Sequence, residues 1–177
     1  MSFFYILALA LVATTSSKPA RDSTASSANL CEDGWTRYED SCYYIEREEK
    51  MPFRQAEQRC HDKDASLFVA NSIGEYKTIA LSAPLNYWAW IGLYKESEDA
   101  PAVWESKDSM NFEELTWITK PYGNAANGWT TASQCAAHWN PSVEVGKYTF
   151  WYPCSFSYYF ICERNSTATA SSSEKMF

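Results

Sequence analysis

The chain has 177 residues, a formal net charge of -7 at pH 7, two histidines and six cysteines. This length suits one globular domain with flanking segments. An acidic chain without a cluster of Lys and Arg is a poor match for nucleic acid, heparin or an anionic membrane. Two histidines without Cys-x-x-Cys pairs are also a poor match for a zinc site.

The N-terminal segment, residues 1–17, differs in composition from the rest of the chain. An unbroken apolar run from Phe3 to Ala13 is followed by small residues and then by Lys18. The run is much shorter than the ~20 residues that span a bilayer, and the pattern is typical of a secretory signal peptide. We therefore expect a secreted, extracellular protein without a transmembrane anchor, although no Lys or Arg precedes the run.

Both ends of the mature chain are rich in small polar residues. Ser, Ala and Thr dominate residues 18–30, and the composition of residues 164–177 is similar. Such segments bury too little apolar surface to fold alone, so we expect disordered tails on either side of one domain at 31–163. Asn165 begins an Asn-x-Ser/Thr sequon and is a candidate N-glycosylation site in a secreted protein. An unmodified tail asparagine is the alternative.

The six cysteines all lie between Cys31 and Cys162, inside the predicted domain. An even count in an exported chain indicates disulfides, because the extracellular environment is oxidising. Six cysteines allow fifteen pairings, and their spacing alone does not choose among them.

Two amphipathic helices are predicted in the first half of the domain. One begins at Pro52, since proline suits the first helical position. The other follows a capping box formed by Ser72 and Glu75. Their apolar faces comprise Phe53, Ala56 and Cys60 in the first helix, and Tyr76, Ile79 and Ala80 in the second.

Runs of aromatic and β-branched residues predict the strands. These runs lie at 42–45, 88–93, 136–139, 147–152 and 158–162. Between them, residues 95–134 form a long polar segment interrupted by Pro and Gly. A long irregular segment inside a compact domain is usually functional, so we expect the binding surface there.

The features that identify the fold occur in a specific order along the chain. They are Cys42-Tyr43-Tyr44, Phe53-x-x-Ala56-x-x-x-Cys60, Trp90-Ile91-Gly92-Leu93, Trp104, Trp117, Cys135, Cys154 and Phe160-Ile161-Cys162-Glu163. In this order the chain resembles the C-type lectin-like domain over about 130 residues. The resemblance implies an α+β fold in which two helices flank small antiparallel sheets and a long irregular loop region. It also implies the disulfides Cys31–Cys42, Cys60–Cys162 and Cys135–Cys154.

Sugar-binding members of this family hold calcium on the long loop, but the matching positions here carry other side chains. The family's Glu/Gln-Pro-Asn/Asp segment corresponds to Lys120-Pro121-Tyr122, its intermediate Glu to Ser133, and its Trp-Asn-Asp segment to Thr149-Phe150-Trp151. At a second family calcium position Asp99 fits but Lys95 does not. Calcium prefers hard, mostly anionic oxygen ligands, and an ammonium repels a dication. We therefore expect no calcium at the family's sugar-binding site and no other cofactor.

The long loop offers aromatic rings and amides instead. The candidate ligand-binding residues are Tyr122, Asn124, Asn127, Trp129 and Gln134. A sugar can stack on an aromatic ring while amides bond its hydroxyls, and Trp and Tyr also provide large contact areas for protein ligands. Alternatively, Trp129 and Trp151 pack the loop onto the core.

Together these features predict a secreted recognition module whose long loop binds a glycan or an extracellular protein without the usual calcium site. The sequence shows no catalytic constellation, so we do not expect an enzyme. The alternative is a structural or matrix-type protein that uses the fold for assembly and binds no sugar. The sequence does not determine the oligomeric state.

Overall fold

The computed structural model describes residues 31–106, 109–141 and 147–166. The predicted signal peptide at 1–17 and the segment 18–30 lie outside these residues, as does the C-terminal tail beyond Ser166. In the described ranges no helix has both the length and the apolar character needed to cross a membrane.

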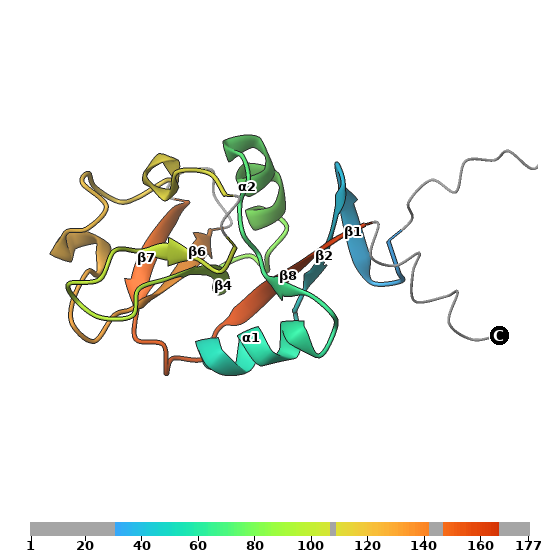
Figure 1. Ribbon diagram of the computed structural model, residues 1–177, viewed down its shortest axis with the longest axis horizontal. Helices are drawn as coiled ribbons and strands as arrows, with labels where there is room; N and C mark the ends of the chain where they lie inside the picture. The colour runs from blue at the N-terminus through green and yellow to red at the C-terminus, as the bar shows by residue number, and fades with distance from the viewer. Residues whose placement is uncertain (1–30, 107–108, 142–146, 167–177) are drawn as a thin grey trace, which may run out of the picture.

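The strands of the described residues follow one another in the order β1-β2-β8-β4-β6-β7, with β3 paired to β8 and β5 paired to β4 (Figure 1). Their bounds are β1 Trp35–Tyr38, β2 Ser41–Ile45, β3 Ser66–Leu67, β4 Tyr87–Tyr94, β5 Val103–Trp104, β6 Cys135–Asn140, β7 Tyr148–Tyr152 and β8 Tyr159–Asn165. The pairs are antiparallel except for β4 and β8, which are parallel at Ala89–Tyr159 and Trp90–Phe160. This parallel pairing joins the two halves of the domain and was not expected from the antiparallel sheets that the resemblance implies.

The two predicted helices are present as α1 (Phe53–His61) and α2 (Ile73–Ala80). Pro52 is the N-cap of α1 rather than its first helical residue, because its ψ of 153° is extended. At the start of α2 the Ser72 hydroxyl accepts a hydrogen bond from the Glu75 amide at 3.1 Å, as a capping box requires. Both predicted apolar faces are buried.

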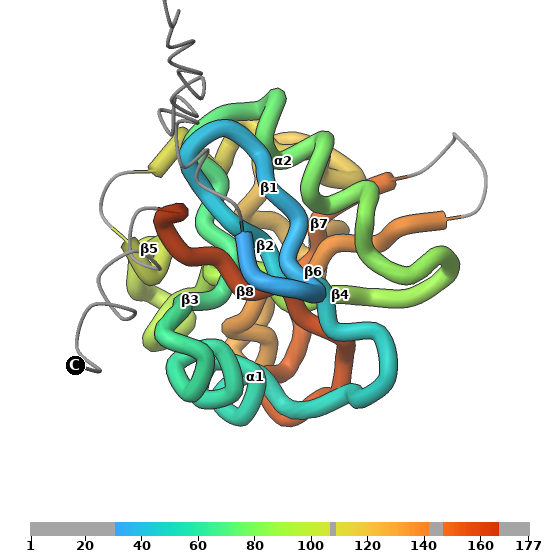
Figure 2. Tube along the Cα trace, turned by 90° about the vertical axis from the view of Figure 1, so that its right-hand side faces the viewer, coloured from blue at the N-terminus to red at the C-terminus, as the bar shows by residue number. Residues whose placement is uncertain are grey.

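Side chains on the two faces of β4, β6 and β7 enter two separate cores. The first core contains Ile91 and Trp151 together with the buried residues of α2, and the second contains Trp90 together with those of α1. Figures 1 and 2 show α1 and α2 on opposite sides of the central strands. Since successive strand residues point to opposite faces, one strand supplies both cores.

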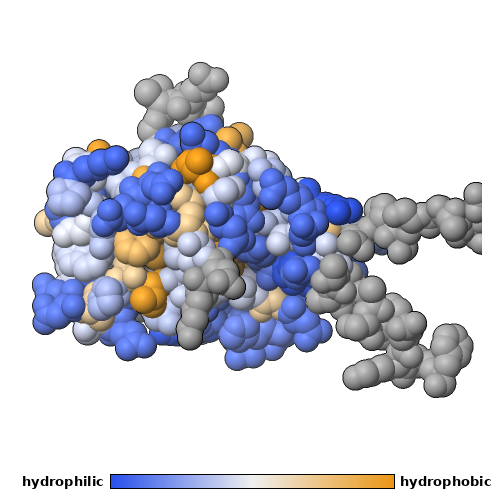
Figure 3. Space-filling view, turned by 45° about the horizontal axis from the view of Figure 1, so that its top comes forward, coloured by the Kyte–Doolittle hydropathy of each residue, from blue (hydrophilic) through white to orange (hydrophobic). Residues whose placement is uncertain are grey.

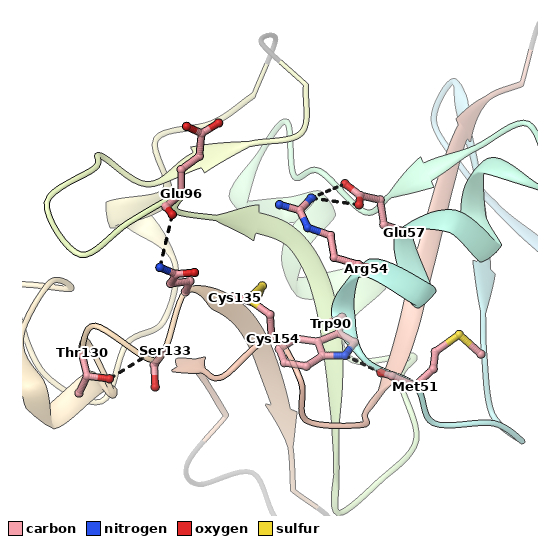
Figure 4. Close-up of a disulfide and its surroundings, with 10 residues drawn as sticks. Met51, Arg54, Glu57, Trp90, Glu96, Thr130, Ser133, Cys135 and Cys154 are labelled. Atoms are coloured by element: carbon pink, nitrogen blue, oxygen red, sulfur yellow. Dashed lines mark hydrogen bonds and ion pairs between the residues drawn. A yellow bond between two sulfur atoms is a disulfide. The ribbon is translucent and has the colours of Figure 1, made fainter.

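All three disulfides implied by the resemblance are confirmed: Cys31–Cys42, Cys60–Cys162 and Cys135–Cys154. The second joins α1 to β8 across 102 residues, and the chain-entropy model assigns about 4–5 kcal/mol to a loop of this length. The third ties the start of β6 to the chain that leaves β7 (Figure 4). The C-terminal border of the long irregular segment is therefore held by a covalent link at Cys135.

A buried group of acids lies where β2, β8 and α2 meet. The Tyr43 hydroxyl donates a hydrogen bond to Glu75. Glu163 accepts hydrogen bonds from the Ser41 hydroxyl at 2.9 Å and from the Val69 amide at 3.2 Å. Burial, together with the nearby Glu75 carboxylate, raises the pKa of Glu163 to about 7.

The described ends of the domain lie side by side. Strand β8 continues to Asn165, two residues beyond the predicted domain end, because it pairs with β2 up to Ser41. The amide of Ser166 then donates a hydrogen bond to the Asp40 carbonyl at 2.8 Å. The predicted disordered tail at 164–177 is thus ordered up to Ser166.

Candidate functional site

The long loop between β5 and β6 is organised around the side chain of Asn127, which is 0% exposed. Its Oδ1 accepts a hydrogen bond from the Thr119 amide at 3.0 Å. Its Nδ2 lies 2.7, 3.2 and 3.1 Å from the carbonyl oxygens of Thr119, Pro121 and Tyr122. All of these partners belong to the loop itself, so Asn127 fixes the path of residues 119–122.

Asn124 stabilises the next turn of the same loop, the short 3-10 helix η2 (Ala125–Asn127). Its Oδ1 accepts a hydrogen bond from the Asn127 amide at 3.1 Å, and its Nδ2 donates to the Thr119 hydroxyl at 2.9 Å. Asn124 therefore caps η2 and, unlike Asn127, remains partly exposed.

Gly128 ends η2 and brings the loop into contact with β7. Its φ of +78° lies in the left-handed region, where side chains are strained. A Cβ at this position would lie 2.3 Å from both Phe150 Cε1 and the Trp151 carbonyl oxygen. The close approach of loop and strand therefore requires glycine.

Contacts between aromatic rings pack the loop against the first core. Trp151 is fully buried and stacks on Trp117 with ring centroids 5.6 Å apart. Trp129 meets Trp151 edge to face at 5.1 Å, and Tyr122 meets Trp129 in the same way at 5.8 Å. Trp151 thus packs the loop onto the core, whereas Tyr122 and Trp129 are half-buried with part of each surface open to solvent.

A buried ammonium lies beneath the loop. Lys95 is only 2% exposed, and its Nζ lies 3.6 Å from the centroid of the Trp129 ring. The same Nζ donates a hydrogen bond to the Thr130 carbonyl at 3.1 Å. Burial lowers the pKa of Lys95, and the carboxylates of Glu98 and Asp99 oppose that shift. Lys95 thus places an ammonium group against the loop at Trp129 and Thr130.

Gln134 lies at the other border of the loop, immediately before Cys135. Its side-chain amide is 3.4 Å from the Glu96 carbonyl, in the region drawn in Figure 4. The structure therefore brings Tyr122, Asn124, Asn127 and Trp129 together, while Gln134 contacts a different segment.

A cavity of about 420 Å³ opens on the outside of the loop, lined by Glu113, Lys120, Pro121 and Tyr122. Burial raises the pKa of Tyr122, and the Glu113 carboxylate adds to the shift. The lining combines an aromatic ring with one acidic and one basic side chain. Glu113 belongs to no motif, and only the folded loop brings it to this site.

The surface around the upper part of the molecule mixes polar and apolar areas. On the face shown in Figure 3, a narrow band of hydrophobic surface runs between hydrophilic side chains. A ligand for such a surface needs apolar and hydrogen-bonding groups close together.

The side chains at the positions of the family's calcium ligands do not fit calcium. They are an ammonium at Lys120, a buried hydroxyl at Ser133, and aromatic rings at Phe150 and Trp151. The Ser133 amide bonds to the Thr130 hydroxyl at 3.2 Å, within a turn of the loop (Figure 4). In residues 31–106, 109–141 and 147–166, no group of three or more His, Cys, Asp or Glu could hold a metal ion.

Sequence comparison matches the family described as "Lectin C-type domain" to residues 49–164. C-type lectin domain-containing protein 87 of Caenorhabditis briggsae is 42% identical over 158 residues, which cover 84% of this chain and 67% of that protein. C-type lectin domain-containing protein 91 of Caenorhabditis elegans is 44% identical over 147 residues, which cover 79% of this chain and 64% of that protein. The chain thus spans about two thirds of the length of these relatives.

Solved structures show the same fold. The carbohydrate-recognition domain of the mouse scavenger receptor C-type lectin has a TM-score of 0.61 and 26% identity, covering 77% of this chain and 98% of that domain. A calcium-independent type II antifreeze protein has a TM-score of 0.61 and 25% identity, covering 77% of this chain and 95% of that protein.

Proposed function

Since the chain belongs to the C-type lectin domain family, we propose that it is a secreted recognition module. In this proposal the long loop binds a glycan or an extracellular protein without the family's usual calcium site. The family is one of recognition domains, which supports binding rather than catalysis.

The observation that carries the proposal is the cavity formed by Glu113, Lys120, Pro121 and Tyr122. It lies at the segment that corresponds to the family's Glu/Gln-Pro-Asn/Asp calcium ligands, and its lining carries an ammonium and an aromatic ring at the matching positions Lys120 and Tyr122. A pyranose ring or an aromatic side chain of a partner can rest against Tyr122. The Glu113 carboxylate accepts hydrogen bonds from its polar groups, and the Lys120 ammonium donates to them.

Preorganisation of this cavity by internal contacts supports binding without a metal. Asn127 holds the three carbonyl groups that define residues 119–122, and Lys95 supports Trp129 from below. A loop that is already ordered loses less conformational entropy on binding, so more of the interaction energy appears as affinity.

We also propose that the domain is not an enzyme. His138 is buried, its Nδ1 lies 2.7 Å from the Tyr76 hydroxyl, and its Nε2 has no hydrogen-bond partner among the described residues. Burial lowers the pKa of His138 to about 3, so the imidazole stays neutral at physiological pH. The other histidine, His61, is exposed on α1 and does not line the cavity.

A glycan array and an extracellular protein array, each probed with calcium and again with a chelator, test the loop proposal. We expect binding that survives the chelator and that is lost on Tyr122→Ala. Tyr87→Ala removes a 44% exposed tyrosine outside the cavity and serves as the matched control. Binding that requires calcium, or that is unaffected by Tyr122→Ala, would sink the proposal.

Secretion and modification at Asn165 form a separate part of the proposal. Asn165 is exposed at the end of β8, which supports its accessibility to modification. Expression in eukaryotic cells should place the protein in the medium, with a mass that falls on treatment with an N-glycosidase. Retention in the cell, or the same mass for wild type and Asn165→Gln, would contradict these assignments.

A further inference from the structure

Seven aromatic side chains gather on the face of β4, β6 and β7 that points away from the first core and the long-loop cavity. We name this group the aromatic platform. It consists of Trp88, Trp139, Tyr148, Phe150, Tyr152, Phe156 and Tyr158. None of the seven belongs to the candidate residues of the loop.

Strand register explains why the platform is continuous. Trp88 on β4 is opposite Trp139 on β6, and Trp139 is opposite Tyr148 on β7, so three rings form a row across the sheet. Along β7, Tyr148, Phe150 and Tyr152 alternate with residues that enter the first core, which places the three on one face. Their ring centroids are 6.4 and 4.9 Å apart.

Trp88 holds the rings of the platform in fixed positions. Its ring centroid lies 5.1 Å from Trp139, 5.4 Å from Tyr148, 6.2 Å from Phe150 and 4.7 Å from Tyr152. The interplanar angles range from tilted to perpendicular, which is the favoured arrangement for aromatic pairs. The platform is thus a rigid surface rather than a set of independent side chains.

The second core accounts for part of the platform only, since Trp88, Tyr152 and Tyr158 pack against it. Helix α1 has nine residues and covers Trp90, which donates its indole N–H to the Met51 carbonyl at 2.9 Å (Figure 4). The platform continues beyond this point, where its rings are half-buried and Phe156 is 48% exposed. On its loop side the platform is bordered by Gly128, which approaches the Phe150 ring.

Polar groups accompany the rings. Burial raises the pKa of the Tyr158 hydroxyl to about 12, and it also raises the pKa of Tyr152. Both phenols therefore remain protonated at physiological pH and can donate as well as accept hydrogen bonds. A platform of this kind offers stacking surfaces with hydroxyl groups at their edges.

The area and the charge of the platform restrict what it can bind. An aromatic side chain presents about 200 Å² when fully exposed, so seven mostly buried ones leave on the order of 500 Å². A stable protein interface buries roughly 800 Å² per partner, which the platform does not supply. No platform residue is charged, and the net charge of -7 repels polyanions.

We propose that the aromatic platform is a second binding site, for a neutral glycan of β-linked pyranose units. In such a chain the ring substituents lie near the ring plane, so each sugar presents a flat face of C–H groups to an aromatic ring. The row formed by Trp88, Trp139 and Tyr148 gives successive sugars successive rings. The tyrosine hydroxyls bond the sugar hydroxyls at the edges.

Titration of the mature protein with chitotetraose and with cellotetraose, in the presence of a chelator, tests the proposal. Binding is measured by calorimetry and by tryptophan fluorescence, since Trp88 and Trp139 belong to the platform. Maltotetraose, whose α-linkages do not give a flat chain, is the control ligand. We expect at least one β-linked probe to bind and maltotetraose to bind more weakly.

Two variants locate the site, and a third separates it from the loop. Tyr148→Ala should weaken binding roughly tenfold, as the loss of one aromatic contact predicts. Phe150→Leu keeps apolar volume beside the loop but removes a ring, and it should also weaken binding. Tyr122→Ala should leave affinity for the β-linked probes unchanged. Thermal melting of each variant verifies that it is folded.

Several results would overturn the proposal. One is the absence of binding by both β-linked probes to wild type, and another is binding to Tyr148→Ala and Phe150→Leu that is as tight as to wild type. Loss of binding in Tyr122→Ala alone would assign the sugar to the loop cavity. Sedimentation that shows a dimer dispersed by Tyr148→Ala would assign the platform to a second copy of the chain.

Discussion

Asn127 provides the sharpest test of how the loop is held, because its amide has donor and acceptor roles that can be changed separately. Asn127→Asp keeps an oxygen for the Thr119 amide but replaces the NH₂ group with an oxygen. That oxygen would face the carbonyl groups of Thr119, Pro121 and Tyr122. Asn127→Ala removes both roles without introducing charge.

The expected magnitudes follow from the contacts. Each intramolecular hydrogen bond contributes about 1 kcal/mol, and a buried group left without a partner costs about 1–3 kcal/mol. Asn127→Ala should therefore destabilise the native loop by roughly 3 kcal/mol. Asn127→Asp should cost more at pH 7, on the order of 5 kcal/mol, because a buried carboxylate is added to the repulsion between oxygens.

The effect of pH on Asn127→Asp has a definite sign. Burial and the facing carbonyls raise the pKa of the introduced carboxyl above its value of about 3.9 in the unfolded chain. Its protonated form can donate a hydrogen bond to one carbonyl. The deficit relative to wild type should therefore shrink as the pH falls from 7 to 4 and grow as the pH rises.

Urea unfolding of the protein with intact disulfides, monitored by tryptophan fluorescence, gives the free energy of unfolding at pH 7 and pH 4. Limited proteolysis reports opening that is confined to the loop. Asn124→Ala is the matched control, since it removes a partly exposed cap and should cost about 1 kcal/mol. If Asn127→Asp matches wild type in both assays at pH 7, Asn127 does not organise the loop.

Three further predictions concern other parts of the fold. The folded pKa of Glu163, about 7, exceeds its unfolded value of 4.5, so its burial favours the folded state below pH 4.5 and that contribution is lost as the pH rises through 7. In wild type the free energy of unfolding, measured with urea, should therefore fall by on the order of 2 kcal/mol more between pH 5 and pH 8 than in Glu163→Gln. The same pH dependence in both proteins would contradict this prediction. Lys95→Met should lower the free energy of unfolding by roughly 1–2 kcal/mol, because the cation–π contact and a charged hydrogen bond are lost. A variant more stable than wild type would show that the desolvation of the ammonium exceeds the stabilisation by its contacts. Gly128→Ala should destabilise by roughly 2–4 kcal/mol, whereas Gly34→Ala, also at positive φ but in open space, should cost only about 1–2 kcal/mol; equal melting temperatures for the two variants would refute the close contact at Gly128.

The regular elements with strong local signals could be predicted from the sequence. The Ser72 and Glu75 pair marked the start of α2, and Phe53, Ala56 and Cys60 marked the buried face of α1. The disulfide pairing followed from the family resemblance rather than from spacing. Strands β3 and β5 have two residues each and exist only through their pairing with β8 and β4, so they leave no periodic pattern.

The candidate site was harder to predict, because the role of an amide depends on where it points. Asn127 was expected among the ligand-binding residues, yet its side chain is directed inward and bonds only to the loop. Glu113 has no motif and reaches the cavity through η1 (Phe112–Glu114), which places it near Lys120. The alternation along β7 is visible in the sequence, but which face α1 leaves uncovered depends on tertiary packing.

The close placement of the two described ends has a consequence for how the domain can be presented. Strands β1 and β8 both flank β2, and Ser166 bonds to Asp40, so the chain enters and leaves at one end of the domain. In Figure 1 the long loop lies at the opposite end. A tether attached to either terminus therefore leaves the loop pointing outward. Several copies on one support could then engage a repeated ligand simultaneously, which converts weak single contacts into strong overall attachment.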